Sequence, residues 1–261
     1  MVVFAIKAFI RLTYLGFVMA RQHAVSYIAY IINAVFWLLL IMLPSAIYSR
    51  NPHQFVVLFL PAYVAMMVAS TGASSVFEFL SWYVYQGLTD VYREAGLGVY
   101  HYLVSSHVVD FLISLTSYFL LAFIVGSQIG LEPAWFLRVN PLYFSLLFPA
   151  AVAVETFFGG LAAAILTTTR IGTGFYGFLL MLLSITAYTP LWLLPSPLLG
   201  FLSPAVLVAE LLRASYGYSA IPGGLLLGMA LLLILVYYFA GYAMCKLADK
   251  TIAKYGIEFR M

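Results

Sequence analysis

The sequence predicts an all-α integral membrane protein. Of its 261 residues, 65% are hydrophobic and only 8% are charged, whereas a soluble domain carries about 25% charged residues. The charges fall in short clusters between long apolar runs, and each run compares with the roughly 20 residues that an α-helix needs to cross the hydrocarbon core. These runs are apolar on every face, which disagrees with the alternating strands of an outer-membrane β-barrel.

The first 22 residues predict a helix that lies in the membrane interface. At about 100° per residue, Lys7, Arg11, Arg21 and Gln22 fall within an arc of roughly 100°, and the remaining surface is apolar. Such a helix turns its basic stripe toward water and lipid phosphates. Lys7 and Arg11 also interrupt the apolar stretch, which argues against a signal peptide.

Six apolar stretches follow, and each is predicted to span the membrane. The predicted spans are residues 24–48, 55–80, 108–131, 141–166, 174–194 and 220–246. The amphipathic residues 81–107 are predicted to form a cytoplasmic region between the second and third spans. With the amino terminus in the cytoplasm, all but three of the 12 Lys and Arg residues lie inside, the exceptions being Arg50, Arg138 and Arg213. We therefore expect a multi-pass protein of the cytoplasmic membrane with both termini in the cytoplasm.

A proline-rich segment, residues 195–219, separates the fifth and sixth spans. Pro195, Pro197 and Pro204 exclude one continuous helix, yet the runs LLGFL and AVLVAELL are too apolar for an aqueous loop. Two short re-entrant helices in the outer leaflet fit this pattern, and an ordinary outer loop with an interfacial helix is the alternative. Re-entrant backbone is tolerated only against protein or a watery cavity, so the segment is a candidate rim of a transport path.

The motifs of catalysis and of metal binding are missing from the sequence. It contains no GxxxxGK[ST], no GxSxG and no GxGxxG after a strand. Cys245 is the only cysteine, and the four histidines, all near segment ends, have no metal-ligand spacing. The net charge of +3 comes from the edges of helices and does not indicate nucleic-acid binding. We expect no enzyme, no metal site and no cofactor in this chain.

One carboxylate lies near the middle of a predicted span. Glu155 falls within residues 141–166, and a charge at such a depth costs on the order of 2.5 to 3.5 kcal/mol. Either it is a buried, hydrogen-bonded structural group or it belongs to a transport path. Glu78 and Asp110 lie near the cytoplasmic ends of the second and third spans, where we expect them to be solvated.

Small residues recur at four-residue spacing in two of the predicted spans. The pairs are Gly159 with Ala163, Gly160 with Ala164, and Gly224 with Gly228. Such spacing lets helices approach each other closely. It indicates packing within the chain or between chains.

Two motifs resemble the permeases of type-2 ABC exporters. The run TDVYREAGLGVYHYLVSSHVVDFL resembles their cytoplasmic coupling element, roughly R-E-x-G-T-L-E-x-L-x-x-[ST]-P, and the matching residues are Arg93, Glu94, Gly96 or Gly98, Leu103, Ser105 and Ser106. It departs from that pattern with His107 in place of the usual proline and Tyr100 in place of an acidic residue. The run LSPAVLVAELLRA is similar to their outer-leaflet L-[SN]-P-x-x-x-x-x-E-x-x-R, through Pro204, Glu210 and Arg213.

The resemblance implies an export permease that works with a separate ATPase. Two ATPase subunits would bind ATP and Mg, and a second permease chain would complete a homodimer or heterodimer among membrane lipids. The implied coupling residues are Asp90, Tyr92, Arg93, Glu94, Gly96 and Gly98. Candidates for the transport path or outer gate are Glu155, Pro204, Glu210 and Arg213, with the last two paired at helical three-residue spacing. The expected substrate is amphipathic: lipid-like, drug-like or glycan-linked.

Two other functions remain open. An ion-coupled secondary transporter would use Glu155 as its proton carrier, although six spans without an evident inverted repeat disfavour it. A membrane scaffold or an intramembrane enzyme is the third reading, and no residue constellation supports it.

Overall fold

The computed structural model describes residues 2–22, 24–85, 96–130, 132–168, 177, 181–182, 186–189 and 191–255. These residues form helices and turns without a strand, which confirms the all-α class. The α-helices are α1 (Val2–Gln22), α2 (Ala24–Tyr48), α3 (Pro52–Tyr85), α5 (Val99–Gln128), α6 (Pro141–Ser145), α7 (Leu147–Thr168), α9 (Ala205–Ser215) and α10 (Gly223–Tyr255). The 3₁₀ helices are η1 (Pro133–Leu137), η2 (Thr186–Tyr188), η3 (Leu191–Leu193) and η4 (Pro197–Leu202).

Four helical stretches of the described chain are long and apolar enough to cross a membrane. They are Pro52–Phe77, Val99–Gln128, Pro141–Thr168 and Gly223–Lys254, and they overlap the second, third, fourth and sixth predicted spans. The protein is therefore embedded in a membrane. Helix α2 has the bounds of the first predicted span. The fifth, residues 174–194, is described only in part, and its second half contains the short 3₁₀ helices η2 and η3.

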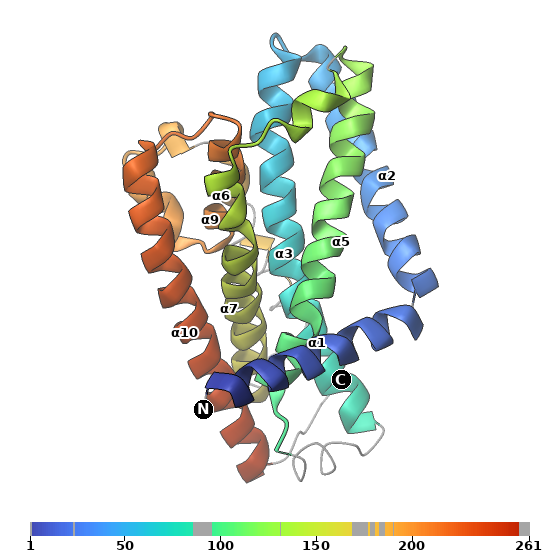
Figure 1. Cartoon of the computed structure of the whole chain (residues 1–261), viewed down its shortest axis with the longest axis vertical. Helices are drawn as coiled ribbons and strands as arrows, with labels where there is room; N and C mark the ends of the chain where they lie inside the picture. The colour runs from blue at the N-terminus through green and yellow to red at the C-terminus, as the bar shows by residue number, and fades with distance from the viewer. Residues whose placement is uncertain are drawn as a thin grey trace.

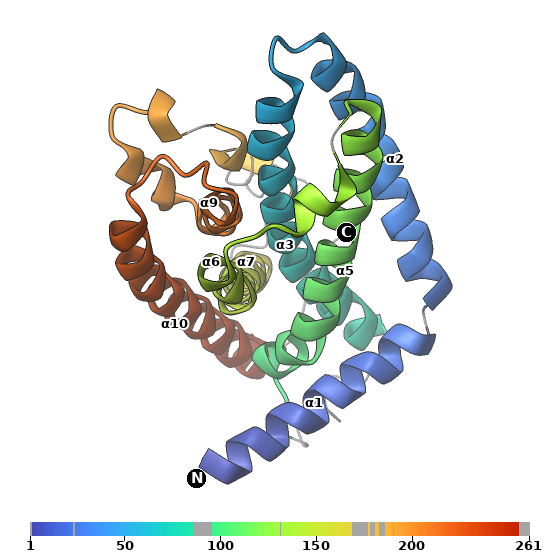
Figure 2. The same ribbon diagram turned by 45° about the horizontal axis from the view of Figure 1, so that its top comes forward.

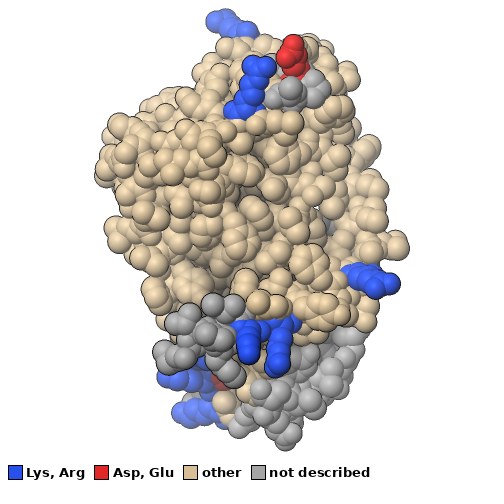
Figure 3. All heavy atoms as spheres, viewed as in Figure 1, with Lys and Arg blue, Asp and Glu red and all other residues tan. Residues whose placement is uncertain are grey.

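The long helices form a bundle, and α1 lies across one end of it (Figure 1). Helix α7 is central because it packs against both α3 and α10, and α3 in turn packs against α5. Helix α1 rests on α5, where Gly16 allows the close approach, since a Cβ there would collide with the carbonyl of Ser105. Lys and Arg side chains occur toward both ends of the face shown in Figure 3, and a broad uncharged zone separates them. This pattern suits a membrane-embedded bundle with an interfacial helix.

Helices α3 and α5 extend into the two ends of the predicted cytoplasmic region, residues 81–107, and residues 86–95 between them lie outside the described residues. Residues 81–85 continue α3, and residues 99–107 are the first turns of α5. Helix α5 begins at Val99 because the Asp249 carboxylate of α10 accepts the Val99 N–H at 3.0 Å, which satisfies a donor that a helix start leaves open. A proline at position 107 would break this helix, whereas His107 lets it run on.

The proline-rich segment ends in a short, enclosed helix. Every residue of α9 is buried, and α9 lies among α3, α6 and α7 (Figure 2). With 11 residues, it is about 16 Å long and cannot span a membrane. An interfacial helix would expose one face, whereas α9 exposes none. Placement of α9 in the outer leaflet stays a prediction.

Burial differs sharply between the centre and the edge of the bundle. In the apolar stretch of α3, 72% of the residues are buried, against 17% in that of α10. Leu232 and Phe239 are examples of the exposed large side chains of α10. The outer face of α10 is therefore available to lipid, whereas α3 and α7 form the core in which buried polar residues need protein partners.

Candidate functional site

The basic residues of α1 lie on its surface. Lys7, Arg11 and Arg21 are exposed, and the helix also exposes Ile10 and Tyr14. Apolar and basic side chains on one exposed helix, set across the end of a bundle (Figure 1), match the geometry of an interfacial helix.

Only part of the predicted coupling element can be placed. Asp90, Tyr92, Arg93 and Glu94 lie outside the described residues, as residues 86–95 do in general. Gly96 has a φ of +69°, a left-handed conformation that favours glycine. Gly98 precedes α5, and a Cβ there would collide with the Asp249 carboxylate that caps this helix. Asp249 was not predicted to have a role. The two glycines thus shape the turn that leads into α5.

Glu210 and Arg213 are paired, as their spacing predicts. Arg213 Nη1 donates to Glu210 Oε1 at 2.7 Å, and each residue is 1% exposed. Ser219 Oγ donates to the second carboxylate oxygen at 3.1 Å. Both oxygens of Glu210 are therefore satisfied within the bundle.

The remaining donors of Arg213 reach two other elements. Nε and Nη2 donate to the carbonyl of Leu58 in α3, at 3.0 and 2.8 Å, and Nη2 also donates to the carbonyl of Ala187 in η2 at 2.7 Å. Pro61 lies one turn after Leu58 and interrupts the hydrogen bonding of α3 in this region. Arg213 thus ties α9 to α3 and η2. Pro204 precedes α9 as its N-cap residue. A role of these residues at an outer gate stays a prediction.

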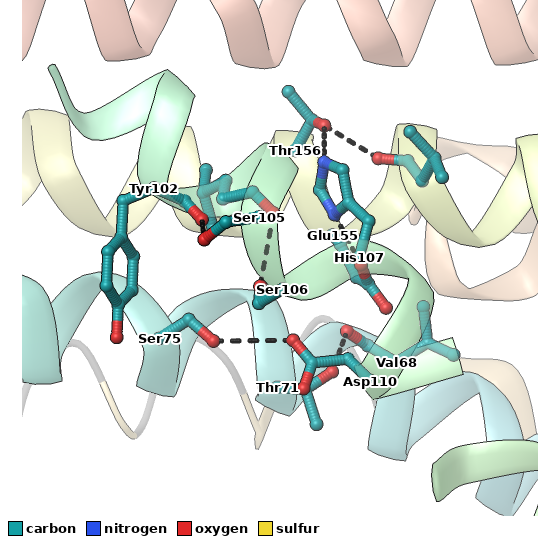
Figure 4. Close-up of polar contacts among 12 residues, drawn as sticks. Val68, Thr71, Ser75, Tyr102, Ser105, Ser106, His107, Asp110, Glu155 and Thr156 are labelled. Carbon is teal, nitrogen blue, oxygen red and sulfur yellow. Dashed lines mark hydrogen bonds and ion pairs between the residues drawn. The ribbon is translucent and has the colours of Figure 1, made fainter. Parts of the chain in front are cut away.

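Glu155 is also buried, and its partner comes from another helix. Its Oε2 lies 2.6 Å from Nδ1 of His107 in α5, and both residues are 1% exposed. The other ring nitrogen, Nε2, lies 3.2 Å from Thr156 Oγ1. Figure 4 shows the imidazole between Thr156 and Glu155, with Asp110 beside them. The second oxygen of Glu155, Oε1, has no hydrogen-bond partner among the described residues.

The hydrogen bonds of Thr156 locate one proton of His107. Thr156 Oγ1 lies 2.7 Å from the carbonyl of Val152, and two oxygens that close need a hydrogen between them. Because a hydroxyl has one hydrogen, Thr156 donates to Val152 and accepts from Nε2–H. His107 Nδ1 and Glu155 Oε2 then share a single further proton. The pair is either a neutral acid facing a neutral imidazole or a carboxylate facing an imidazolium.

Asp110 is buried, which corrects the prediction that it is solvated. It is 5% exposed, and Ser75 Oγ of α3 donates to its Oδ2 at 3.5 Å. Asp110 follows His107 by three residues, so both lie on one face of α5. The side chain of Glu78 lies outside the described residues.

His107 is the candidate site residue that sequence reasoning missed. Because His107 lies next to the start of the predicted span 108–131, it suggested a residue without a function. Helix α5 begins before that position, at Val99, and its first turns are buried against α3 and α7. The available signal was the His107–Asp110 spacing, together with a mid-span Glu155 in need of a partner.

Glycines bring the helices of this site together. A Cβ at Gly72 in α3 would lie 2.7 Å from the Cα of Glu155, and one at Gly159 in α7 would lie 2.7 Å from the Leu103 side chain of α5. Gly160 of α7 and Gly241 of α10 meet in the same way. The small residues at 159 and 160 therefore serve packing within the chain.

Gly224 and Gly228 of α10 are different, because a Cβ at either position would meet open space. Their spacing serves no packing within the described chain.

Among the described residues, no group of three or more His, Cys, Asp or Glu side chains is arranged to hold a metal ion. The short contact between His107 Nδ1 and Glu155 Oε2 holds a proton between the two side chains. No family model, curated protein or solved structure matches the chain. A function has to be inferred from the residues and their geometry.

Proposed function

We propose that the chain is the transmembrane subunit of an ATP-driven exporter of the ABC-2 type, which moves an amphipathic substrate out of the cytoplasm. The observation that carries the proposal is α9, a helix too short to span, wholly buried and tied to α3 by Arg213. It coincides with the motif of Pro204, Glu210 and Arg213 that resembles the outer-leaflet element of these permeases. The crosswise α1 at the other end supports the same architecture (Figure 1).

The connection between α3 and α5 suits a coupling function. Residues 86–95 join the end of α3 to the start of α5, so a displacement there acts on both helices at once. The Asp249 cap extends the link to α10. A separate ATPase that binds ATP and Mg would engage this segment through Asp90, Arg93 and Glu94. Closure of the ATPase dimer would then shift a bundle of two permease chains between two states.

The test is affinity purification of the tagged chain from native membranes in mild detergent, followed by mass spectrometry. We expect an ATPase with a GxxxxGK[ST] motif at one copy per permease chain. The double variant Arg93→Ala/Glu94→Ala should lose the ATPase while it still elutes as a folded protein. Arg50→Ala, which changes an arginine on the side predicted to be external, is the matched control and should keep the ATPase. Absence of any ATPase, while other membrane complexes stay intact, would contradict the proposal.

The proton shared by His107 and Glu155 favours a second candidate, an ion-coupled transporter in which Glu155 carries the proton. This candidate predicts transport by the purified chain in liposomes, driven by a pH gradient alone. Glu155→Gln would abolish that transport. Activity that requires the ATPase and ATP would exclude it.

A further inference from the structure

Serine and threonine hydroxyls on the helices of this protein mostly donate to their own helix. The acceptor is a carbonyl three or four residues earlier, for Ser70, Thr71, Ser105, Ser106, Ser127, Ser145, Thr156, Thr167, Thr168, Ser215 and Thr251. Ser114 and Ser117 of α5 differ. Both are fully buried, and neither hydroxyl has a hydrogen-bond partner among the described residues.

These two serines share a helix face with the site already described. At about 100° per residue, His107, Asp110, Ser114 and Ser117 fall within an arc of about 80° on α5. Glu155 Oε1, on the neighbouring α7, also lacks a partner. Ser114 and Ser117 therefore continue the face of His107 along α5, about two and three turns further on. We refer to these five residues as the polar line.

An unpaired buried hydroxyl costs about 1 to 3 kcal/mol, and a helical serine can avoid this cost by bonding to its own helix. Ser114 and Ser117 both lack this hydrogen bond to their own helix. We infer that their hydroxyls bond to a molecule other than protein. A buried water makes about three hydrogen bonds to polar groups that would otherwise be unsatisfied. Ser114 and Ser117 offer two such groups one turn apart on α5, and Glu155 Oε1 offers a third on α7.

We propose that the polar line is a water-containing proton-binding site inside the bundle. The proton moves between His107 and Glu155: the Nδ1–H bond breaks, its electron pair stays on Nδ1, and an O–H bond forms at Oε2. Water at Ser114, Ser117 and Oε1 exchanges this proton with the aqueous phase. Asp110 is the titratable carboxyl group next to His107 on the same face of α5, and Ser75 and Thr156 are the uncharged polar groups that face the line from α3 and α7.

This inference goes beyond the export function, because it assigns a proton site whichever energy source drives transport. It adds water access to the second candidate function, and its tests need neither the ATPase nor a substrate. If no ATPase is found, the proposal of a proton site still stands. If the polar line contains no water, the proposal of an export function still stands.

Water access is tested by cysteine labelling in membranes. The background is Cys245→Ala, which removes the only native thiol. Into it we place Ser114→Cys or Ser117→Cys, with Ala122→Cys as the control, a buried residue of the same helix on another face. Since the thiolate is the reacting species and forms in water, both serine variants should react with a small water-soluble methanethiosulfonate about tenfold faster than the control. Labelling as slow as in Ala122→Cys would overturn the proposal.

Proton binding is tested by infrared difference spectroscopy of the purified chain. A protonated carboxylic acid has a carbonyl stretch that a carboxylate lacks. We expect such a band to change with pH, to shift in D₂O, and to vanish in Glu155→Gln but not in Glu132→Gln, whose carboxylate is exposed. A Glu155 band that neither changes with pH nor shifts in D₂O, or no such band at all, would overturn the proposal.

Discussion

The bundle buries two acid–base pairs, Glu210 with Arg213 and Glu155 with His107, and they differ in how completely they are satisfied. In the first pair, both carboxylate oxygens accept hydrogen bonds and the guanidinium makes four. In the second pair, one carboxylate oxygen has no partner among the described residues. All four residues are 1% exposed, so burial alone does not distinguish the pairs.

The difference separates a structural brace from a site that can change its protonation. Guanidinium groups stay protonated in proteins, so the Arg213 pair holds a fixed charge. Imidazole and carboxyl groups can each release or accept a proton, and a short contact between them allows the proton to shift. We expect the first pair to control folding and the second to control function.

The largest effect should come from Arg213→Ala, which removes four hydrogen bonds and leaves the Glu210 charge buried alone. Loss of one partner of a buried ion pair costs about 3 to 5 kcal/mol. The fraction of detergent-purified protein that stays monodisperse on heating measures this loss. Arg138→Ala, an exposed arginine, should behave as wild type. Normal heat resistance of Arg213→Ala would show that the guanidinium does not brace α9.

The two carboxylates can be compared by the same substitution. Glu210→Gln leaves the Arg213 charge without a counterion and should cost about 3 kcal/mol. Glu155→Gln should cost about 1 kcal/mol or less if the pair is neutral, because an amide N–H then replaces the acid O–H that faces Nδ1. Unfolding in SDS-containing mixed micelles, followed by tryptophan fluorescence, measures both. Equal losses would show that His107 and Glu155 are both charged at rest.

A smaller effect is expected where α3 crosses α7. In Gly72→Ala, the new methyl meets the backbone of Glu155, which cannot rotate away, and overpacking costs about 1 to 3 kcal/mol. Gly228→Ala places its methyl in open space and should leave the same unfolding midpoint unchanged or slightly raised. If both variants unfold alike, the close crossing does not position Glu155.

The smallest effect should come from Thr156→Val, which leaves the Nε2–H of His107 without its acceptor at a cost of about 1 kcal/mol. Thr167→Val is the matched control, because Thr167 also donates to its own helix but contacts no histidine in any described hydrogen bond. We expect Thr156→Val to alter the pH dependence of the Glu155 infrared band and the control to leave it unchanged. A wild-type band in Thr156→Val would contradict the proton assignment on Nε2.

Several features of the fold follow from local chemistry and were predictable. The bounds of α2 match residues 24–48 because this uncharged apolar run ends at the polar turn of Ser49, Arg50 and Asn51. The Glu210–Arg213 pair is predictable because two residues three apart on a helix meet without help from the rest of the chain. The break before α9 is predictable from prolines that cannot continue a helix.

The composition and periodicity of the sequence thus determined that this is a helical membrane protein, where its apolar segments lie, and which neighbours on one helix pair. Only the tertiary structure decided that the N–H of Val99, at the start of α5, is capped by Asp249 on α10. It also decided that Glu155 faces His107 and that Asp110 is buried. These contacts join residues far apart in the sequence, and they depend on glycines that set how closely the helices cross. Local sequence patterns do not predict these contacts, because the groups that pack against one face of a helix come from distant parts of the chain.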